Sequence, residues 1–272
     1  MPWETYSAII QQEWETLLAR TDSVENDFQE FLERHPCCLP PTQMIFGGGG
    51  HGAYPGAIVS QPKLNGFSKK IPDFLCKTRD SAAVYAVLVE IEHPSKPWAT
   101  GNGQSSAEFT QAINQIADWK SWFCDPVNVM SFQRDYRIPA DWLRSRSFVQ
   151  KYVLIYGRRS DPSLTEEFNK KRKLLEREDE FYMTYDRIRP YKDSSQDLCA
   201  KLDAIGYRAL SVPPTLTLGP IMAHGVNQVR DKAAAVQLNR YLSDVRKKFL
   251  IERIPYWDAW DGSGIRSSTD VE

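Results

Sequence analysis

Residues 71–92 read IPDFLCKTRDSAAVYAVLVEIE, and this stretch decides the fold. Residues 71–78 and 84–92 have the composition of two strands, and the polar break at 79–81 predicts a hairpin turn between them. The second strand is almost continuously apolar until two glutamates end it, which indicates a strand buried on both faces. The stretch therefore predicts a buried sheet with acidic side chains at its end.

The sequence on either side of this stretch predicts helices and further strands. Residues 3–20 place apolar side chains on one helical stripe, and a second helix follows 21–23. Ser105 and Glu108 have the spacing of a capping box at the start of another helix. The remaining expected elements are strands at 57–64 and 152–156 and helices at 105–123, 163–178, 194–204 and 230–250. This order of elements predicts an α/β fold.

Three segments outside this pattern carry weaker signals. The glycine-rich stretch 47–52 lacks the Gly-Lys-Ser/Thr ending of a phosphate-binding loop, so we expect a surface loop. In the helix expected at 230–250, the basic cluster 246–248 lies near the C-terminal end, where it would complement the helix dipole. Residues 261–272 predict a mobile tail. The helix expected at 230–250 would have an apolar face that consists of Ala234, Leu238, Tyr241, Leu242, Val245 and Phe249.

Composition limits the possible classes of protein. The 272 residues are 42% apolar and 25% charged, as in ordinary globular proteins. The net charge of -1 argues against a purely electrostatic DNA binder, so nucleic-acid binding would need a local basic patch. We expect a cytoplasmic protein without membrane association, because there is no secretory leader pattern and no run of roughly 18 apolar residues. The five cysteines show no metal-binding spacing, which favours free thiols.

The acidic residues of the opening stretch suggest a metal site. Glu90 and Glu92 are two apart on a strand, so their side chains leave the same face, roughly 6 to 7 Å apart. Hairpin pairing would bring Asp73 alongside, and three carboxylates would share one pocket. A divalent cation would offset their repulsion, and Mg²⁺ or Mn²⁺ with oxygen ligands suits phosphodiester hydrolysis. The alternative is that the glutamates pair with Lys96 or nearby arginines.

Three motifs resemble one known family. Residues 71–74 (IPDF), 89–94 (VEIEHP) and 115–119 (QIADW) resemble the Shedu-type nuclease family of antiviral defence proteins, within the PD-(D/E)XK superfamily. The resemblance also includes residues 25–29 (ENDFQ). It implies a mixed central sheet flanked by helices. The resemblance implies a nuclease-like core at 22–190, and the residues outside it predict an N-terminal helix at 1–21, a C-terminal helical extension at 191–260 and the tail at 261–272.

The resemblance also implies roles for individual residues. Asp73, Glu90 and the backbone carbonyl of Ile91 would bind Mg²⁺ or Mn²⁺, and Gln115 would line the catalytic site unless it is only a polar face residue. Glu92 stands where the superfamily usually has a catalytic lysine. Glu92 could act as a third ligand or general base, or the protein could be an inactive homologue. In the remaining explanation a displaced lysine fills the role, and the candidates are Lys63, Lys69, Lys70 and Lys96.

Glu25 and three tryptophans carry weaker expectations. Glu25 matches a first-helix acid that sometimes completes such sites, although a helix-capping role fits its spacing better. Trp98, in the loop before the 105–123 helix, is a candidate for contact with a ligand, whereas Trp119 and Trp122 are expected in the core.

The resulting functional hypothesis is a metal-dependent nuclease in prokaryotic antiphage defence. Its expected substrate is DNA, with RNA as the alternative, and the resemblance suggests a homo-oligomer. The second hypothesis is a catalytically inactive nuclease-fold protein that binds nucleic acid or acts as a scaffold. A third is a pure protein-interaction module.

Overall fold

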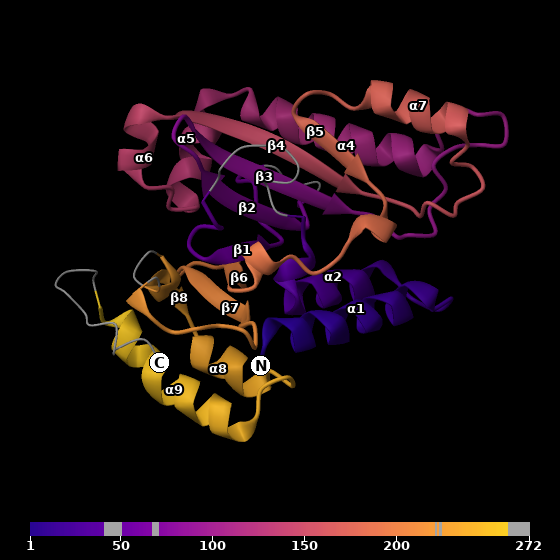
Figure 1. The fold of residues 1–272 in the computed structure, drawn as a ribbon. Coiled ribbons are helices and arrows are strands. Elements are labelled where there is room, and N and C mark those ends of the chain that lie inside the picture. The colour runs from indigo at the N-terminus through magenta and orange to yellow at the C-terminus, as the bar shows by residue number, and fades with distance from the viewer. Residues whose placement is uncertain (41–50, 67–70, 221, 223–224, 261–272) are drawn as a thin grey trace. The chain divides into compact units, whose positions relative to one another are not determined.

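The computed structural model of the protein describes residues 1–40, 51–66, 71–220, 222 and 225–260 (Figure 1). The chain divides into two compact units, and each is described by itself. The central unit consists of residues 61–75 and 79–188. The terminal unit consists of residues 1–60, 76–78 and 189–272, so strand β2 (Phe74–Arg79) contributes residues to both units.

The central unit contains strands in the order β5-β4-β3-β2. Strand β3 (Ala83–Ile91) pairs in parallel with β4 (Ser147–Ile155), and β4 pairs in parallel with β5 (Glu180–Met183). All nine residues of β3 are in register with β4, and all but one are buried. The predictions of strands at 84–92 and 152–156 are confirmed.

The turn between β2 and β3 forms where the polar break predicted it. The Asp80 backbone N–H donates to the carbonyl oxygen of Ala83 at 2.9 Å. One carboxylate oxygen of Asp80 accepts hydrogen bonds from the backbone N–H groups of Ala82 and Ala83, both at 2.7 Å. These contacts hold the carboxylate in its charged form and lower the pKa of Asp80.

Four helices of the described chain belong to the central unit. They are α4 (Ala107–Phe123), α5 (Pro126–Asp135), α6 (Ala140–Ser145) and α7 (Glu166–Leu175). Helices α4 and α7 confirm the predictions at 105–123 and 163–178. The N-cap of α4, however, is Ser106, whose hydroxyl oxygen accepts from the Phe109 N–H at 3.0 Å, so the predicted capping box of Ser105 and Glu108 is wrong.

The terminal unit begins with the two predicted helices, α1 (Trp3–Ala19) and α2 (Glu25–Arg34). Strand β1 (Ala57–Ser60) pairs in parallel with β6 (Leu198–Leu202), and β6 pairs antiparallel with β7 (Tyr207–Ser211). The short strand β8 (Val229–Arg230) lies parallel to β7. Parallel and antiparallel pairings therefore both occur, and the predicted mixed α/β class is confirmed.

The helix expected at 194–204 is wrong, because this segment contains strand β6. Leu198, Cys199 and Ala200 are fully buried on β6, which is hydrogen-bonded to β1 and β7. Strand β1 is distant in sequence, and the pairing of β6 with it and with β7 satisfies the backbone in a way that helical spacing could not reveal. The segment 191–260 is thus not purely helical.

The single helix expected at 230–250 is also wrong. Two helices, α8 (Lys232–Leu238) and α9 (Asp244–Asp258), are separated at Asn239, whose carboxamide accepts from the Tyr241 N–H and donates to the Val212 carbonyl. The break divides the predicted apolar face, since Leu238 and Val245 are each 82% exposed whereas Leu242 is buried. The buried side chains of α9 are Leu250, Ile254 and Trp257.

The break also changes the position of the basic cluster 246–248. These residues lie in the first turns of α9, whose N-cap is Ser243, rather than near a C-terminal end. Positive charge near a helix N-terminus does not complement the dipole, so the predicted dipole role is wrong.

Several expectations are not settled by the described residues. The glycines at 47–50, Lys69, Lys70 and the tail 261–272 lie outside them, and the domain boundaries at 21, 190 and 260 stay predictions. All five cysteines lie inside them and are free thiols. Within the part of the chain that is described, no helix is both long and apolar enough to cross a membrane.

We predict that Ser106→Ala lowers the free energy of unfolding by about 1 kcal/mol, because it removes the cap of the longest helix in the central unit. Ser105→Ala is the matched control and should change the stability by less than about half of that. Urea denaturation followed by circular dichroism measures both. An equal effect of the two substitutions would contradict the assignment of the cap.

Candidate active site in the central unit

The site begins where the chain enters β2. Asp73 stands directly before this strand, and its backbone N–H donates to the Val89 carbonyl on β3 at 3.0 Å. Its carboxylate oxygen Oδ2 accepts from the Ile91 N–H at 2.8 Å. Two hydrogen bonds thus fix Asp73 against the end of β3, and its carboxylate lies against the backbone that links Glu90 to Ile91.

Glu90 is the buried carboxylate of the site, with only 6% of its surface exposed. Its Oε1 accepts a hydrogen bond from the Nε2 amide of Gln115 on α4 at 2.5 Å. A buried charge needs such partners, because the loss of hydration is otherwise costly. The structure therefore brings together Glu90 and Gln115, which sequence reasoning had placed in one site.

Glu92 continues the line of β3 beyond its last residue. Its backbone N–H donates to the Ile155 carbonyl of β4 at 3.0 Å, and its side chain is buried, with 7% exposure. The carboxylate forms an ion pair with Lys96, four residues later, whose side chain is partly exposed. Pairing with Lys96 was the alternative interpretation of this glutamate, and the ion pair is present.

The expectation that Asp73, Glu90 and Glu92 form one three-carboxylate group needs correction. Among the described residues, no set of three or more His, Cys, Asp or Glu side chains lies close enough to hold a metal ion. The contacts give the reason: Glu92 turns to Lys96, and Asp73 binds the Ile91 N–H.

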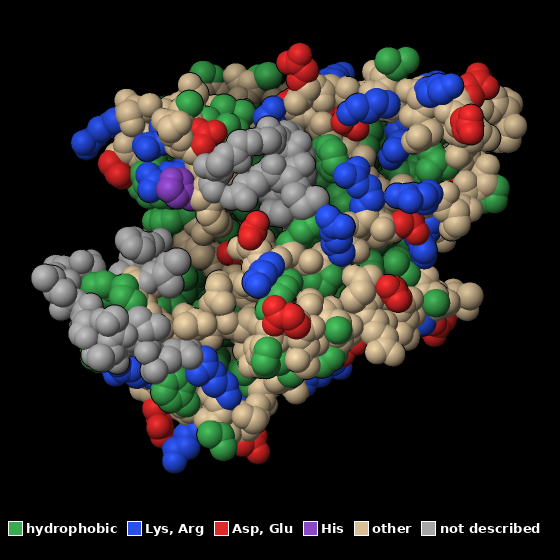
Figure 2. Space-filling view, viewed as in Figure 1, with side chains coloured by type: hydrophobic (Ala, Val, Ile, Leu, Met, Phe, Trp, Pro, Cys, Tyr) green, Lys and Arg blue, Asp and Glu red, His purple; other side chains and the backbone are tan. Residues whose placement is uncertain are grey.

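The carboxyl ends of the parallel strands form one edge of the sheet. Because β3, β4 and β5 run in the same direction, the segments that follow them leave at the same side. After β4 comes Arg158, which forms an ion pair at 2.9 Å with Asp186, and Asp186 also accepts from the Arg159 N–H. Figure 2 shows several Lys and Arg side chains on the face where β4 and β5 end, interspersed with acidic ones.

Trp98 does not take the position that we expected for a ligand contact. Its indole is fully buried and packs against Phe109 and Tyr156, with ring centroids 5.0 and 4.8 Å apart. The Arg172 guanidinium stacks on it at 4.5 Å. Trp98 is therefore a core residue of the loop that follows Glu92, as Trp119 and Trp122 are core residues of α4.

Tyr156 was missed by sequence reasoning. Its hydroxyl donates to the Pro97 carbonyl at 3.0 Å, which ties the end of β4 to the loop that follows Glu92. Burial raises the pKa of Tyr156 to about 12, so the phenol stays protonated at neutral pH. The only signal in the sequence was an aromatic residue at the end of an apolar strand, which ordinarily indicates core packing.

The two remaining candidates are Glu25 and Lys63. Glu25 is the first residue of α2 in the terminal unit, whereas Asp73, Glu90 and Glu92 belong to the central unit. The helix is capped by Asp27, whose carboxylate accepts from the Val24 N–H at 2.9 Å, so the capping role expected for Glu25 is wrong. Lys63 belongs to the central unit, where its carbonyl accepts from the Tyr136 hydroxyl.

A comparison with models of protein families gives a match across this region. The family described as Shedu protein SduA, C-terminal, matches residues 22–188, which is more than half of the chain. The matched range contains Asp73, Glu90, Glu92 and Gln115. A comparison with curated proteins gave no match.

We predict that Gln115→Ala destabilises the protein by about 1 to 3 kcal/mol, because it removes an amide donor from the buried Glu90 carboxylate. Gln111→Ala is the control, since it removes the same kind of side chain from an exposed position of the same helix. Chemical denaturation measures both changes. If Gln115→Ala lowered the free energy of unfolding no more than the control does, the hydrogen bond to Glu90 would not contribute to stability.

Proposed function

The chain belongs to the family described as Shedu protein SduA, C-terminal, and from this premise we propose that it is a metal-dependent nuclease that hydrolyses phosphodiester bonds of DNA. Family membership suggests a role in antiphage defence. The observation that carries the proposed activity is the buried Glu90 carboxylate, with the Asp73 carboxylate fixed against the adjoining peptide.

The donor set fits a hard divalent cation. Asp73, Glu90 and the carbonyl of Ile91 would hold Mg²⁺ or Mn²⁺ through oxygen atoms, which such ions prefer. Mg²⁺ ordinarily binds one or two carboxylates and keeps several waters, so two protein carboxylates suffice. When bound, the ion would lower the pKa of a coordinated water and offset charge on the phosphate.

The side chains around these carboxylates orient and charge the site. The Gln115 amide keeps Glu90 turned toward α4, and the Ile91 N–H keeps Asp73 in place. The ion pair of Glu92 with Lys96 supports the explanation in which a displaced lysine replaces the missing one. In this proposal Lys96 supplies the ammonium that stabilises phosphate charge, and Glu92 positions it.

The substrate would approach along the edge formed by the carboxyl ends of β3, β4 and β5. Ligands of α/β sheets commonly bind at this edge. Arg159 has an exposed side chain there, and Arg158 is held at the same edge by Asp186. Because the net charge is only -1, nucleic-acid binding would need a local basic patch. These arginines would supply positive charge for phosphate binding at this edge without a cationic chain.

We predict that Asp73→Asn and Glu90→Gln each reduce DNA cleavage at least 100-fold in the presence of Mg²⁺ or Mn²⁺. Asp141→Asn and Glu167→Gln are the matched controls, because they remove the same charges from exposed helix positions of the same unit. Time courses on linear and plasmid DNA measure the rates. Cleavage that survives both site substitutions would exclude these carboxylates from catalysis.

The same variants test the competing hypothesis of an inactive nucleic-acid-binding protein, which is motivated by Glu92 at the position where the superfamily usually has a lysine. Calorimetric titration with Mn²⁺ should show binding to the wild-type protein that Glu90→Gln abolishes. DNA binding that needs no divalent cation, together with no cleavage and no Mn²⁺ binding, would favour the inactive protein instead.

We predict that Lys96→Met lowers the cleavage rate about 100-fold, the usual effect of removing one group that stabilises developing charge. Lys96→Arg should retain most of the activity, because it keeps the positive charge opposite Glu92. Lys170→Met is the exposed control on α7. A fully active Lys96→Met variant would show that Lys96 does not stabilise the phosphate charge, and Glu92 or another lysine would then be the candidate.

A further inference from the structure

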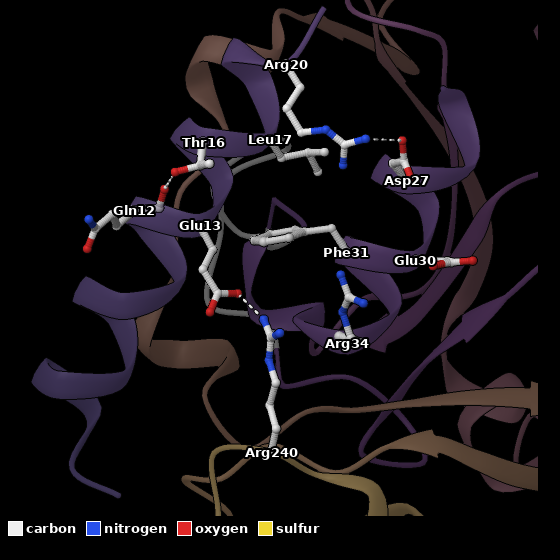
Figure 3. Close-up of a pocket in the computed structure, with 10 residues that line it drawn as sticks. All are labelled: Gln12, Glu13, Thr16, Leu17, Arg20, Asp27, Glu30, Phe31, Arg34 and Arg240. Carbon is white, nitrogen blue, oxygen red and sulfur yellow. Dashed lines mark hydrogen bonds and ion pairs between the residues drawn. The ribbon is translucent and has the colours of Figure 1, made fainter. Parts of the chain in front are cut away.

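The terminal unit contains a polar cavity that the proposed nuclease site does not use. It has a volume of about 560 Å³, which is within the range of about 300 to 1,000 Å³ typical of ligand sites. Its walls come from α1, α2 and the segment between α8 and α9 (Figure 3). Three arginines line it, namely Arg20, Arg34 and Arg240.

Two of these arginines already have acidic partners. Arg240 forms an ion pair with Glu13 at 2.6 Å, and Arg20 lies 3.8 Å from Asp27. Arg34 differs, because its guanidinium forms no hydrogen bond or ion pair with any residue that the structure describes. Figure 3 shows it beside Phe31, with no dashed line to the other residues drawn. Arg34 therefore keeps its five donors available to a ligand.

A second, more apolar cavity of about 280 Å³ shares two of these arginines. Arg34 and Arg240 line both cavities, so the cationic groups stand where the two adjoin. The walls of the second cavity include Leu210, Val212 and Leu238, with the ring of Tyr241. A ligand that fills both cavities would carry an anionic group beside the arginines and a ring-sized apolar group beyond it.

His35 is a buried residue whose pKa is affected by Arg34 and Arg240. Its pKa is lowered to about 3, first by burial and then by the positive charges of Arg34 and Arg240. Its two ring nitrogens lie within hydrogen-bond distance of the Tyr6 and Tyr241 hydroxyls, at 2.8 and 3.2 Å. The imidazole is therefore neutral at neutral pH and adds no charge to the cavity.

We propose that the two cavities form one binding site for a nucleoside monophosphate, with the phosphate on Arg34 and Arg240 and the base in the apolar cavity. Arginine receives phosphate through paired hydrogen bonds, and the Tyr241 ring, over which the Arg240 guanidinium lies at 5.0 Å, lines the apolar cavity. The hydroxyl of Ser211 donates to the Glu33 carbonyl and keeps acceptor capacity for the polar edge of a base.

The acidic residues of the polar cavity limit the size of the anion. Glu13, Asp27 and Glu30 balance the three arginines, so the cavity as a whole is not strongly cationic. A nucleoside triphosphate carries more negative charge than a monophosphate, and a cavity whose arginines are already balanced by carboxylates repels the larger charge more strongly. The charges therefore favour a monophosphate over a nucleoside triphosphate.

Calorimetric titration of the full chain with AMP tests the proposal, with adenosine, inorganic phosphate and ATP as separate titrants. We expect AMP to bind at least ten times more tightly than each of the others. Arg34→Ala and Leu238→Glu should each weaken AMP binding at least tenfold. Both side chains are exposed, so the variants should fold, and circular dichroism checks this.

Two controls keep this test separate from the proposed nuclease site. Lys248→Ala removes a charge from a side chain that is 77% exposed and lines neither cavity, so AMP affinity should not change. Asp73→Asn should also leave AMP affinity unchanged. No AMP binding, equal binding of phosphate, undiminished binding to Arg34→Ala, or loss of binding in Asp73→Asn would each overturn the proposal.

Discussion

The hydrogen bonds between Asp73 and the end of β3 are the constraint on which the candidate active site depends. The Asp73 N–H continues the pairing of the chain with β3 at Val89, and its carboxylate then accepts the next outward N–H, that of Ile91. A side chain thus takes the place of a backbone carbonyl at the start of β2. This substitution ends the regular ladder and leaves a carboxylate at the sheet edge where Glu90 also lies.

The rigidity of this edge comes from the sheet behind it. Strand β3 is in register with β4 over its whole length, and its buried apolar residues fix the alternation of side chains. A slip by one residue would move Glu90 away from α4 and bring Ile91 in its place. Because the core enforces the register, it also places the carboxylate against the Gln115 amide.

Much of the local structure could be predicted from the sequence. Helices α1, α2, α4 and α7 follow from apolar periodicity, and strands β3 and β4 follow from short, nearly continuous apolar runs. Segments with distant partners could not be predicted in this way. Strand β6 depends on β1 and β7, and the break between α8 and α9 depends on a contact of Asn239 with Val212.

For the site, the acids that stand at the end of a buried strand could be read from the sequence alone. The sequence also determined that Gln115 follows on a helix. The partner of each carboxylate became known only from the tertiary structure. Asp73 accepts from the Ile91 N–H, Glu90 accepts from Gln115, and Glu92 pairs with Lys96. The physical reason is that spacing along a strand fixes the face of a side chain, whereas its partner is fixed by what packs against that face.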